Sequence, residues 1–261
     1  GQIVTVSTGE VLNDPENYPI VVHPVDKTDN YIKRCVGVAG DTIEIKDDVV
    51  FIDAVAQKIP PHSEIWYTVT VNNTASLDPD AMKEEYNLDI DKGDYSLTGK
   101  PGEYRMLLTG EAKDKMQKNG LIKTIFPDVY PVGVENVFPY DTVAAHKTST
   151  RDNFGPVWIP AKGASLKLTA ENYAIYERAI RNYENNEFYT KGGKFFLNGK
   201  EVTEYTFKMD YFWMMGDNRQ GSQDSRYWGF VPEDRVVGKA WMIWFSWEGG
   251  PRWKRLFNIV K

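Results

Sequence analysis

The segment "MMGDNRQGSQDSRYWG", residues 214–229, places charged side chains between a methionine pair and a Tyr-Trp pair. Its charges sum to zero, because two acids face two arginines: Asp217, Arg219, Asp224 and Arg226. Breaking a buried ion pair costs about 3 to 5 kcal/mol, so a partly buried network needs paired charges. The planar guanidinium of arginine can bind a carboxylate through two parallel hydrogen bonds. We therefore predict a loop folded onto itself, with its charges paired and its three glycines in tight turns.

This loop has two interpretations. Ion-pair networks often have only a structural role, so one is a rigid loop without chemistry. The other is a loop that holds reactive groups, and a second segment bears on that choice.

The second segment is "NYIKRCVGVAGDTIEI", residues 30–45, which we interpret as an extended stretch with a glycine turn. Strand alternation would place Tyr31, Lys33 and Cys35 on one face. If Lys33 lies in apolar surroundings, desolvation lowers its pKa and yields a neutral amine near pH 7. A neutral amine is a general base. The alternative is a lysine whose stem covers apolar surface while its ammonium reaches water.

Composition excludes several classes of protein. The 261 residues are 41% hydrophobic and 26% charged, which is typical of a globular chain. The net charge of −6 disfavours nucleic acid as a partner. A single cysteine excludes an internal disulfide and a cysteine-based metal site, and the three histidines have no ligand spacing. We predict no metal and no cofactor.

Aromatic residues make up 13% of the chain and favour strands. We predict strands at 3–7, 19–23 and 241–247, a hairpin over 42–52 and another at the Asn198-Gly199 turn. A helix near 169–184 follows from an apolar stripe that begins at Tyr176. The predicted fold is mainly β, with a core formed by residues 1–52 and 151–261.

Residues 53–150 change in character and predict an inserted α+β subdomain. "EIWYTVTV", "EYRMLL" and "IKTIFPDVYP" are predicted strands. Between them lie two predicted helices, one capped by Asp78 with Pro79 in its first turn and one closed by Gly120. No chemistry is predicted for the insert.

The extended segment and "GDNRQGSQDSRYWGFVPEDRVVGKA", residues 216–240, resemble two signature boxes of type I signal peptidases. These are membrane-anchored serine proteases that use a Ser/Lys dyad. The resemblance implies a β catalytic core of coiled antiparallel sheets. It also implies removal of signal peptides from exported preproteins, on the extracytoplasmic (periplasmic) side of the cell membrane.

The resemblance assigns roles position by position. Lys33 matches the general base, and Ser222 matches the serine that orients its amine. Ile32 matches a residue lining the pocket for small side chains. Other matches brace the site or close a turn: Asp217, Asp224 and Arg226 for the former, Gly40 and Asp41 for the latter. The implied partners are signal peptides with an Ala-x-Ala-like cleavage site and a membrane surface.

The family's nucleophile lies in a Ser-x-Ser-Met box upstream of the lysine, and residues 1–261 contain no such box. Ser7 precedes Lys33 without that context. We therefore expect the chain to begin after the nucleophile box and a membrane anchor, and to be inactive alone. The C-terminal tail, with Trp247, Trp253 and Phe257 among basic residues, has two interpretations: contact with a membrane interface, or packing on the core.

Two other functions fit parts of the pattern. A self-cleaving repressor also uses a Ser/Lys pair, but it lacks the long second box and carries a DNA-binding domain. A non-catalytic β module that binds extracytoplasmic peptides would keep the fold without the nucleophile.

Overall fold

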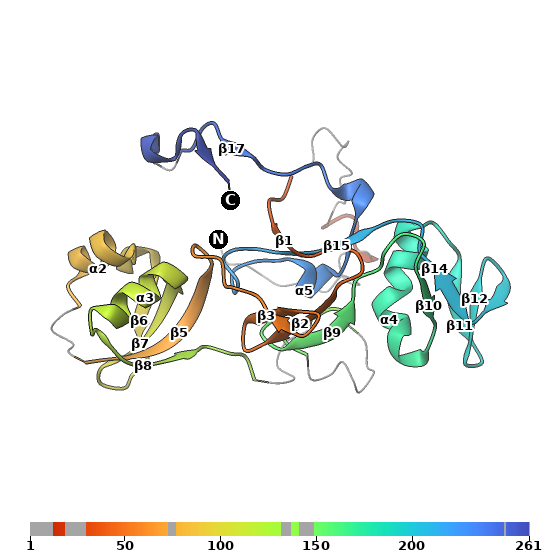
Figure 1. Ribbon diagram of the computed structural model, residues 1–261, viewed down its shortest axis with the longest axis horizontal. Helices are drawn as coiled ribbons and strands as arrows, with labels where there is room; N and C mark the ends of the chain where they lie inside the picture. The colour runs from red at the N-terminus through yellow and green to blue at the C-terminus, as the bar shows by residue number, and fades with distance from the viewer. Residues whose placement is uncertain are drawn as a thin grey trace. The chain divides into compact units, whose positions relative to one another are not determined.

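The computed structural model describes residues 13–18, 30–72, 77–131, 137–140, 149–247 and 249–260 (Figure 1). The chain divides into two compact units, residues 1–32 and 33–261, and the strands and helices below belong to the second. Its paired strands run antiparallel and its helices are few, which confirms the mainly β prediction. The predicted strands at 3–7 and 19–23 lie outside the described residues.

The strands of the described residues form small antiparallel sheets. Two sheets have four strands each, in the spatial orders β4 (Val55–Ala56), β3 (Val49–Ile52), β2 (Thr42–Lys46), β9 (Phe154–Trp158) and β6 (Tyr95–Leu97), β7 (Glu103–Thr109), β5 (Glu64–Val71), β8 (Ile122–Pro127). Two sheets have three strands each, in the orders β1 (Arg34–Gly37), β15 (Tyr211–Met215), β16 (Val231–Pro232) and β11 (Phe188–Lys191), β12 (Lys194–Leu197), β13 (Lys200–Val202). The other two sheets are strand pairs, β10 (Ser165–Lys167) with β14 (Glu204–Thr206) and β17 (Met242–Ile243) with β18 (Asn258–Ile259).

Both predicted hairpins form. Asp47 and Asp48 join β2 to β3 with φ of 47° and 65°, and Asn198 and Gly199 join β12 to β13 with φ of 50° and 79°. Two consecutive positive φ values define the tight turn whose twist matches that of paired strands, and Asn-Gly is its preferred sequence.

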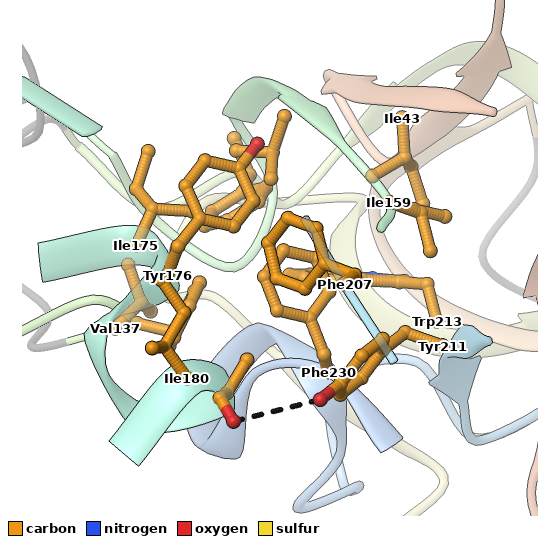
Figure 2. Packing of buried hydrophobic residues seen from close by; sticks show 14 of the residues in the cluster. Ile43, Val137, Ile159, Ile175, Tyr176, Ile180, Phe207, Tyr211, Trp213 and Phe230 are labelled. Carbon is orange, nitrogen blue, oxygen red and sulfur yellow. Dashed lines mark hydrogen bonds between the residues drawn. The ribbon is translucent and has the colours of Figure 1, made fainter. Parts of the chain in front are cut away.

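The main core surrounds β15, where buried and partly buried side chains alternate. Tyr211 and Trp213 are fully buried among other aromatic side chains, and the Tyr211 hydroxyl donates to the Ala179 carbonyl at 3.5 Å (Figure 2). The predicted helix covers this core as α4 (Ala170–Arg178), continued by a π-helix (Ala179–Tyr183). Thr169 and Asn172 form a capping box at its start.

A second core lies within residues 53–150, between the β5 sheet and two helices, α2 (Pro79–Tyr86) and α3 (Gly110–Lys118). The predicted cap is present, because the Asp78 side chain accepts from the Asp80 N–H. Gly120 follows α3 with φ of 69°, as a helix-ending glycine does. The three predicted strands and the two predicted helices form in the predicted order, with the unpredicted short strand β6 between α2 and β7, whereas the domain boundaries stay a prediction.

The predicted strand at 241–247 is wrong over most of its length, because only Met242–Ile243 forms a strand, paired with Asn258–Ile259, and Trp247 makes an isolated bridge to Pro251. Trp241 and Trp244 are mostly exposed, so in this part of the chain no packed layer stabilises a longer strand. Of the two interpretations of the tail, the described residues do not support packing on the core, since Trp253 is 72% exposed. Among the described residues no helix is long and apolar enough to cross a bilayer.

Candidate active site

Lys33 and Ser222 meet although 189 positions separate them. The Lys33 Nζ donates to the Ser222 Oγ at 2.7 Å. Ser222 is buried, with 9% of its surface exposed, and Lys33 is partly buried. The structure thus brings together the two residues predicted to be catalytic, and their roles stay a prediction.

The pairing of β1 with β15 creates this contact. Arg34 pairs with Met215, so the residue before β1 lies beside the residue after β15. The chain then turns at Gly216 into the loop that carries Ser222. The predicted alternation needs a correction, because the strand begins only at Arg34. Tyr31 is 85% exposed and Cys35 is also exposed, so neither is a buried apolar residue.

Gly216 is a site residue that our sequence analysis treated only as a turn. A Cβ at this position would lie 2.2 Å from the Ser222 Oγ and 3.6 Å from the Lys33 Nζ. Real Cβ atoms do not approach so closely, so any side chain here would displace Ser222. The sequence signal was present, since the glycine opens the second signature box.

Asp224 and Arg226 form a fully buried ion pair below the loop. Arg226 Nε and Nη2 donate to the two carboxylate oxygens of Asp224, each at 2.8 Å, and both side chains have no exposed surface. Asp224 also accepts from the Gly216 N–H at 3.0 Å. Burial alone would raise the pKa of Asp224, but these donors hold it below the ordinary value. The pair therefore ties both ends of the loop together, and the bracing role of these two residues stays a prediction.

Asp217 has a different partner from the one expected within its own segment. Arg34 binds it through two hydrogen bonds, Nε to Oδ1 at 2.7 Å and Nη2 to Oδ2 at 2.9 Å. These hydrogen bonds lower the pKa of Asp217. The prediction that the four charges pair among themselves was thus wrong for Asp217, because strand pairing brings a distant cation closer.

Arg219, the fourth charge, points inward instead of pairing within the segment. Only 4% of its surface is exposed, and its Nη1 donates to the Met215 sulfur at 3.4 Å. Its backbone carbonyl accepts from Arg226 Nη2. Burial lowers the pKa of Arg219. The side chain therefore fills space beneath the loop.

Three further positions were predicted, namely Gly40, Asp41 and Ile32. Gly40 has φ of 96° and the Asp41 carboxylate accepts from the Val38 N–H at 2.8 Å, so the predicted turn is confirmed. Ile32 is 71% exposed, and its contact with substrate stays a prediction. In the described ranges no group of three histidine, cysteine or acidic side chains gathers in a way that fits a metal ion.

A family model described as "Signal peptidase, peptidase S26" matches residues 1–102 and 158–247, which are most of the chain. The chain belongs to this family. Signal peptidase I of Buchnera aphidicola subsp. Baizongia pistaciae is 43% identical over 257 residues, 95% of this chain and 63% of that protein. Signal peptidase I of Haemophilus influenzae is 35% identical over 112 residues, 39% of this chain and 30% of that protein. The chain spans less than two thirds of the length of these relatives.

The Lys33–Ser222 contact lies within the part of the chain that the S26 family model matches. The family model covers both residues and leaves out residues 103–157. These belong to the second half of the predicted insert and the start of the returning core. The described site is thus built from matched segments, and part of its support comes from elsewhere in the chain.

Proposed function

We propose that this chain carries the general base of a signal peptidase I, a serine endopeptidase that removes N-terminal signal peptides from exported proteins. Family membership supports the reaction class. The observation that carries the proposal is the 2.7 Å contact between Lys33 Nζ and Ser222 Oγ. It holds a lysine amine in one direction, which a general base requires.

In this proposal Lys33 acts as a neutral amine. The Ser222 hydroxyl oxygen accepts a hydrogen bond from one N–H of the Lys33 amine. The lone pair of that amine then remains available for the proton of an attacking serine hydroxyl. As that oxygen bonds to the scissile carbonyl carbon, Lys33 takes the proton. The C–N bond then breaks, and the lysine ammonium gives the proton to the leaving amine.

Hydrolysis of the acyl-enzyme reverses these roles. A water loses its proton to Lys33 while attacking the ester carbonyl. The serine oxygen leaves with the proton returned by Lys33, and the new carboxyl end is released. Backbone or side-chain donors that stabilise the tetrahedral oxyanion complete the mechanism.

The sequence of residues 1–261 does not identify the attacking serine. The resemblance implies a Ser-x-Ser-Met box, which does not occur in this sequence. We propose that the 261-residue chain does not cleave alone. Ser7, the weaker candidate, lies outside the described residues.

The proposed substrates carry small residues in an Ala-x-Ala-like pattern at the cleavage site. Ile32 would line the pocket that accepts them. The proposed location is the extracytoplasmic face of the cell membrane. Exposed aromatic side chains in the tail, such as Trp247 at 64% and Phe257 at 69%, support contact with a membrane surface.

The test is cleavage of a synthetic signal peptide with alanine at both small positions, using the full-length gene product and the 261-residue chain. We expect cut products from the full-length protein, fewer when one alanine becomes phenylalanine, and none from the chain alone. Robust cleavage by the chain alone would contradict a separate nucleophile. Binding without cleavage by the full-length protein would favour the non-catalytic peptide-binding module.

A further inference from the structure

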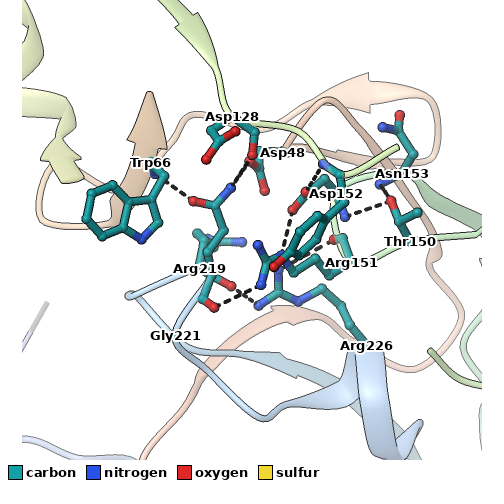
Figure 3. Close-up of polar contacts among 12 residues, drawn as sticks. Asp48, Trp66, Asp128, Thr150, Arg151, Asp152, Asn153, Arg219, Gly221 and Arg226 are labelled. Atoms are coloured by element: carbon teal, nitrogen blue, oxygen red, sulfur yellow. Dashed lines mark hydrogen bonds and ion pairs between the residues drawn. The ribbon is translucent and has the colours of Figure 1, made fainter. Parts of the chain in front are cut away.

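Gln220, two residues before Ser222, bonds to three separate segments. Its Oε1 accepts from the Trp66 N–H at 2.6 Å. Its Nε2 donates to the Asp128 carbonyl at 2.9 Å and to Asp48 Oδ2 at 3.2 Å (Figure 3). These partners lie on β5, after β8 and in the β2–β3 turn, so one amide joins the loop to the insert and to the core hairpin.

The backbone of the same loop also bonds to β5. The Glu64 N–H donates to the Asp217 carbonyl at 2.8 Å, and the Arg219 N–H donates to the Glu64 carbonyl at 2.9 Å. Glu64 and Asn218 thereby form a parallel bridge. The first strand of the insert sheet thus runs into the loop that carries Ser222.

The loop needs such anchoring because glycines flank its central part. Gly216 and Gly221 have more backbone freedom than other residues, and fixing one residue costs about 1 to 2 kcal/mol. Contacts beneath Gly216 hold one end through Asp224. Gln220 is placed to hold the other end, immediately before Gly221 and Ser222.

We propose that Gln220 is a positioning residue through which the inserted β6-β7-β5-β8 sheet fixes the Ser222 loop against Lys33. The catalytic half of this inference rests on the proposed function. It gives the insert a task, because β5 and the segment after β8 supply the N–H and the carbonyl that orient the Gln220 amide. A glutamine fits because its side chain offers one acceptor and two donors in a plane.

The first test is a double-mutant cycle in the full-length gene product with Gln220→Ala, Ser222→Ala and the double variant. We expect Gln220→Ala to lower kcat about tenfold with KM within about twofold, as the loss of one or two hydrogen bonds predicts. If Gln220 acts through Ser222, the double variant should be no slower than Ser222→Ala. The matched control is Gln57→Ala, an exposed glutamine whose amide donates to the nearby Val55 carbonyl.

The second test measures amide hydrogen exchange in the 261-residue chain and needs no activity. In Gln220→Ala the Trp66 and Arg219 amides should exchange about tenfold faster while those of β15 are unchanged. Gln220→Asn, which is one methylene shorter, should behave alike and replaces the alanine variant if that one unfolds. An unchanged Trp66 amide, or additive effects on kcat, would overturn the inference. Active Lys33→Ala or inactive wild-type protein would instead contradict the proposed function, and the exchange result would still decide the role of Gln220.

Discussion

Arg34 and Asp217 join the two segments of the site side by side, through hydrogen bonds of 2.7 and 2.9 Å between guanidinium and carboxylate. Arg34 directly follows Lys33 in the sequence, and Asp217 directly follows Gly216. The ion pair therefore fixes the register at the point where the lysine faces the loop. It also gives a role to the charged residue that follows Lys33 in one segment and Gly216 in the other.

Asp217→Asn should lower kcat about tenfold through misplacement of Lys33, with a loss of unfolding free energy below about 1 kcal/mol, because the pair is partly exposed. The pKa of Asp217 is lowered by Arg34, so its stabilisation is present at neutral pH and lost as pH falls through that lowered value. Urea unfolding at pH 7 and at pH 3 measures this. A difference from wild type that persists undiminished at pH 3 would contradict the ion pair.

Gly216→Ala should displace Ser222, because the added Cβ would lie 2.5 Å from the Ser222 Cβ. We expect at least a hundredfold loss of kcat and about 1 to 3 kcal/mol of destabilisation, as overpacking gives. The matched control is Gly110→Ala, where the nearest atom is 3.8 Å away and the position opens α3. Steady-state kinetics and thermal unfolding measure both variants. Near-normal activity of Gly216→Ala would show that the close packing is not required.

Arg226→Met should destabilise the chain by about 3 to 5 kcal/mol, because it leaves the Asp224 carboxylate buried without its partner. The control is Lys194→Met, which breaks an exposed pair with Glu201 and should cost less than about 1 kcal/mol. Equilibrium unfolding in urea gives both values. Equal losses for the two variants would mean that the buried pair does not hold the loop.

Asp48 should make stability depend on pH. Burial and the facing carboxylate of Asp152 raise the pKa of Asp48 to about 7. Because the folded value is raised above the unfolded one of about 3.9, the stabilisation by protonated Asp48 is complete below pH 4 and is lost as pH rises through 7. Asp48→Asn should thus match wild type near pH 4 and exceed it in unfolding free energy at pH 8.5 by on the order of 4 kcal/mol, because each pKa unit corresponds to about 1.4 kcal/mol.

Urea unfolding across this pH range measures the difference between Asp48→Asn and wild type. Asp47→Asn, at the neighbouring exposed turn position, is the control for changes in turn geometry. A constant offset between Asp48→Asn and wild type at every pH would contradict the raised pKa.

Local signals in the sequence predicted much of the fold. Asn198-Gly199 specifies its hairpin, and Asp78 and Thr169 cap the helices expected there. Each of these residues acts on its own backbone within a few positions, so no distant information is needed. The strand predicted at 241–247 was wrong over most of its length, because its apolar residues need a packed layer that covers them. Composition does not indicate whether such a layer is present.

A contact of the site was predicted only where the family resemblance assigns a role to both of its residues. The Lys33–Ser222 contact followed from the two boxes, but the Arg34–Asp217 pair and the bonds of Gln220 did not. Those contacts depend on the register between β1 and β15 and on where β5 meets the loop. Such long-range geometry is set by packing, and neither spacing nor charge within one segment determines it.

The most direct measurement is the single-turnover cleavage rate of Lys33→Met in the full-length gene product. Methionine keeps a similar chain length and removes the amine, with a sulfur in place of one methylene. Lys46→Met, at the exposed end of β2, is the control. A general base accelerates a reaction by a factor of about 10² to 10⁴. We therefore expect the cleavage rate to fall by that factor for Lys33→Met and to stay unchanged for the control. A folded Lys33→Met protein that cleaves at the wild-type rate would contradict the account.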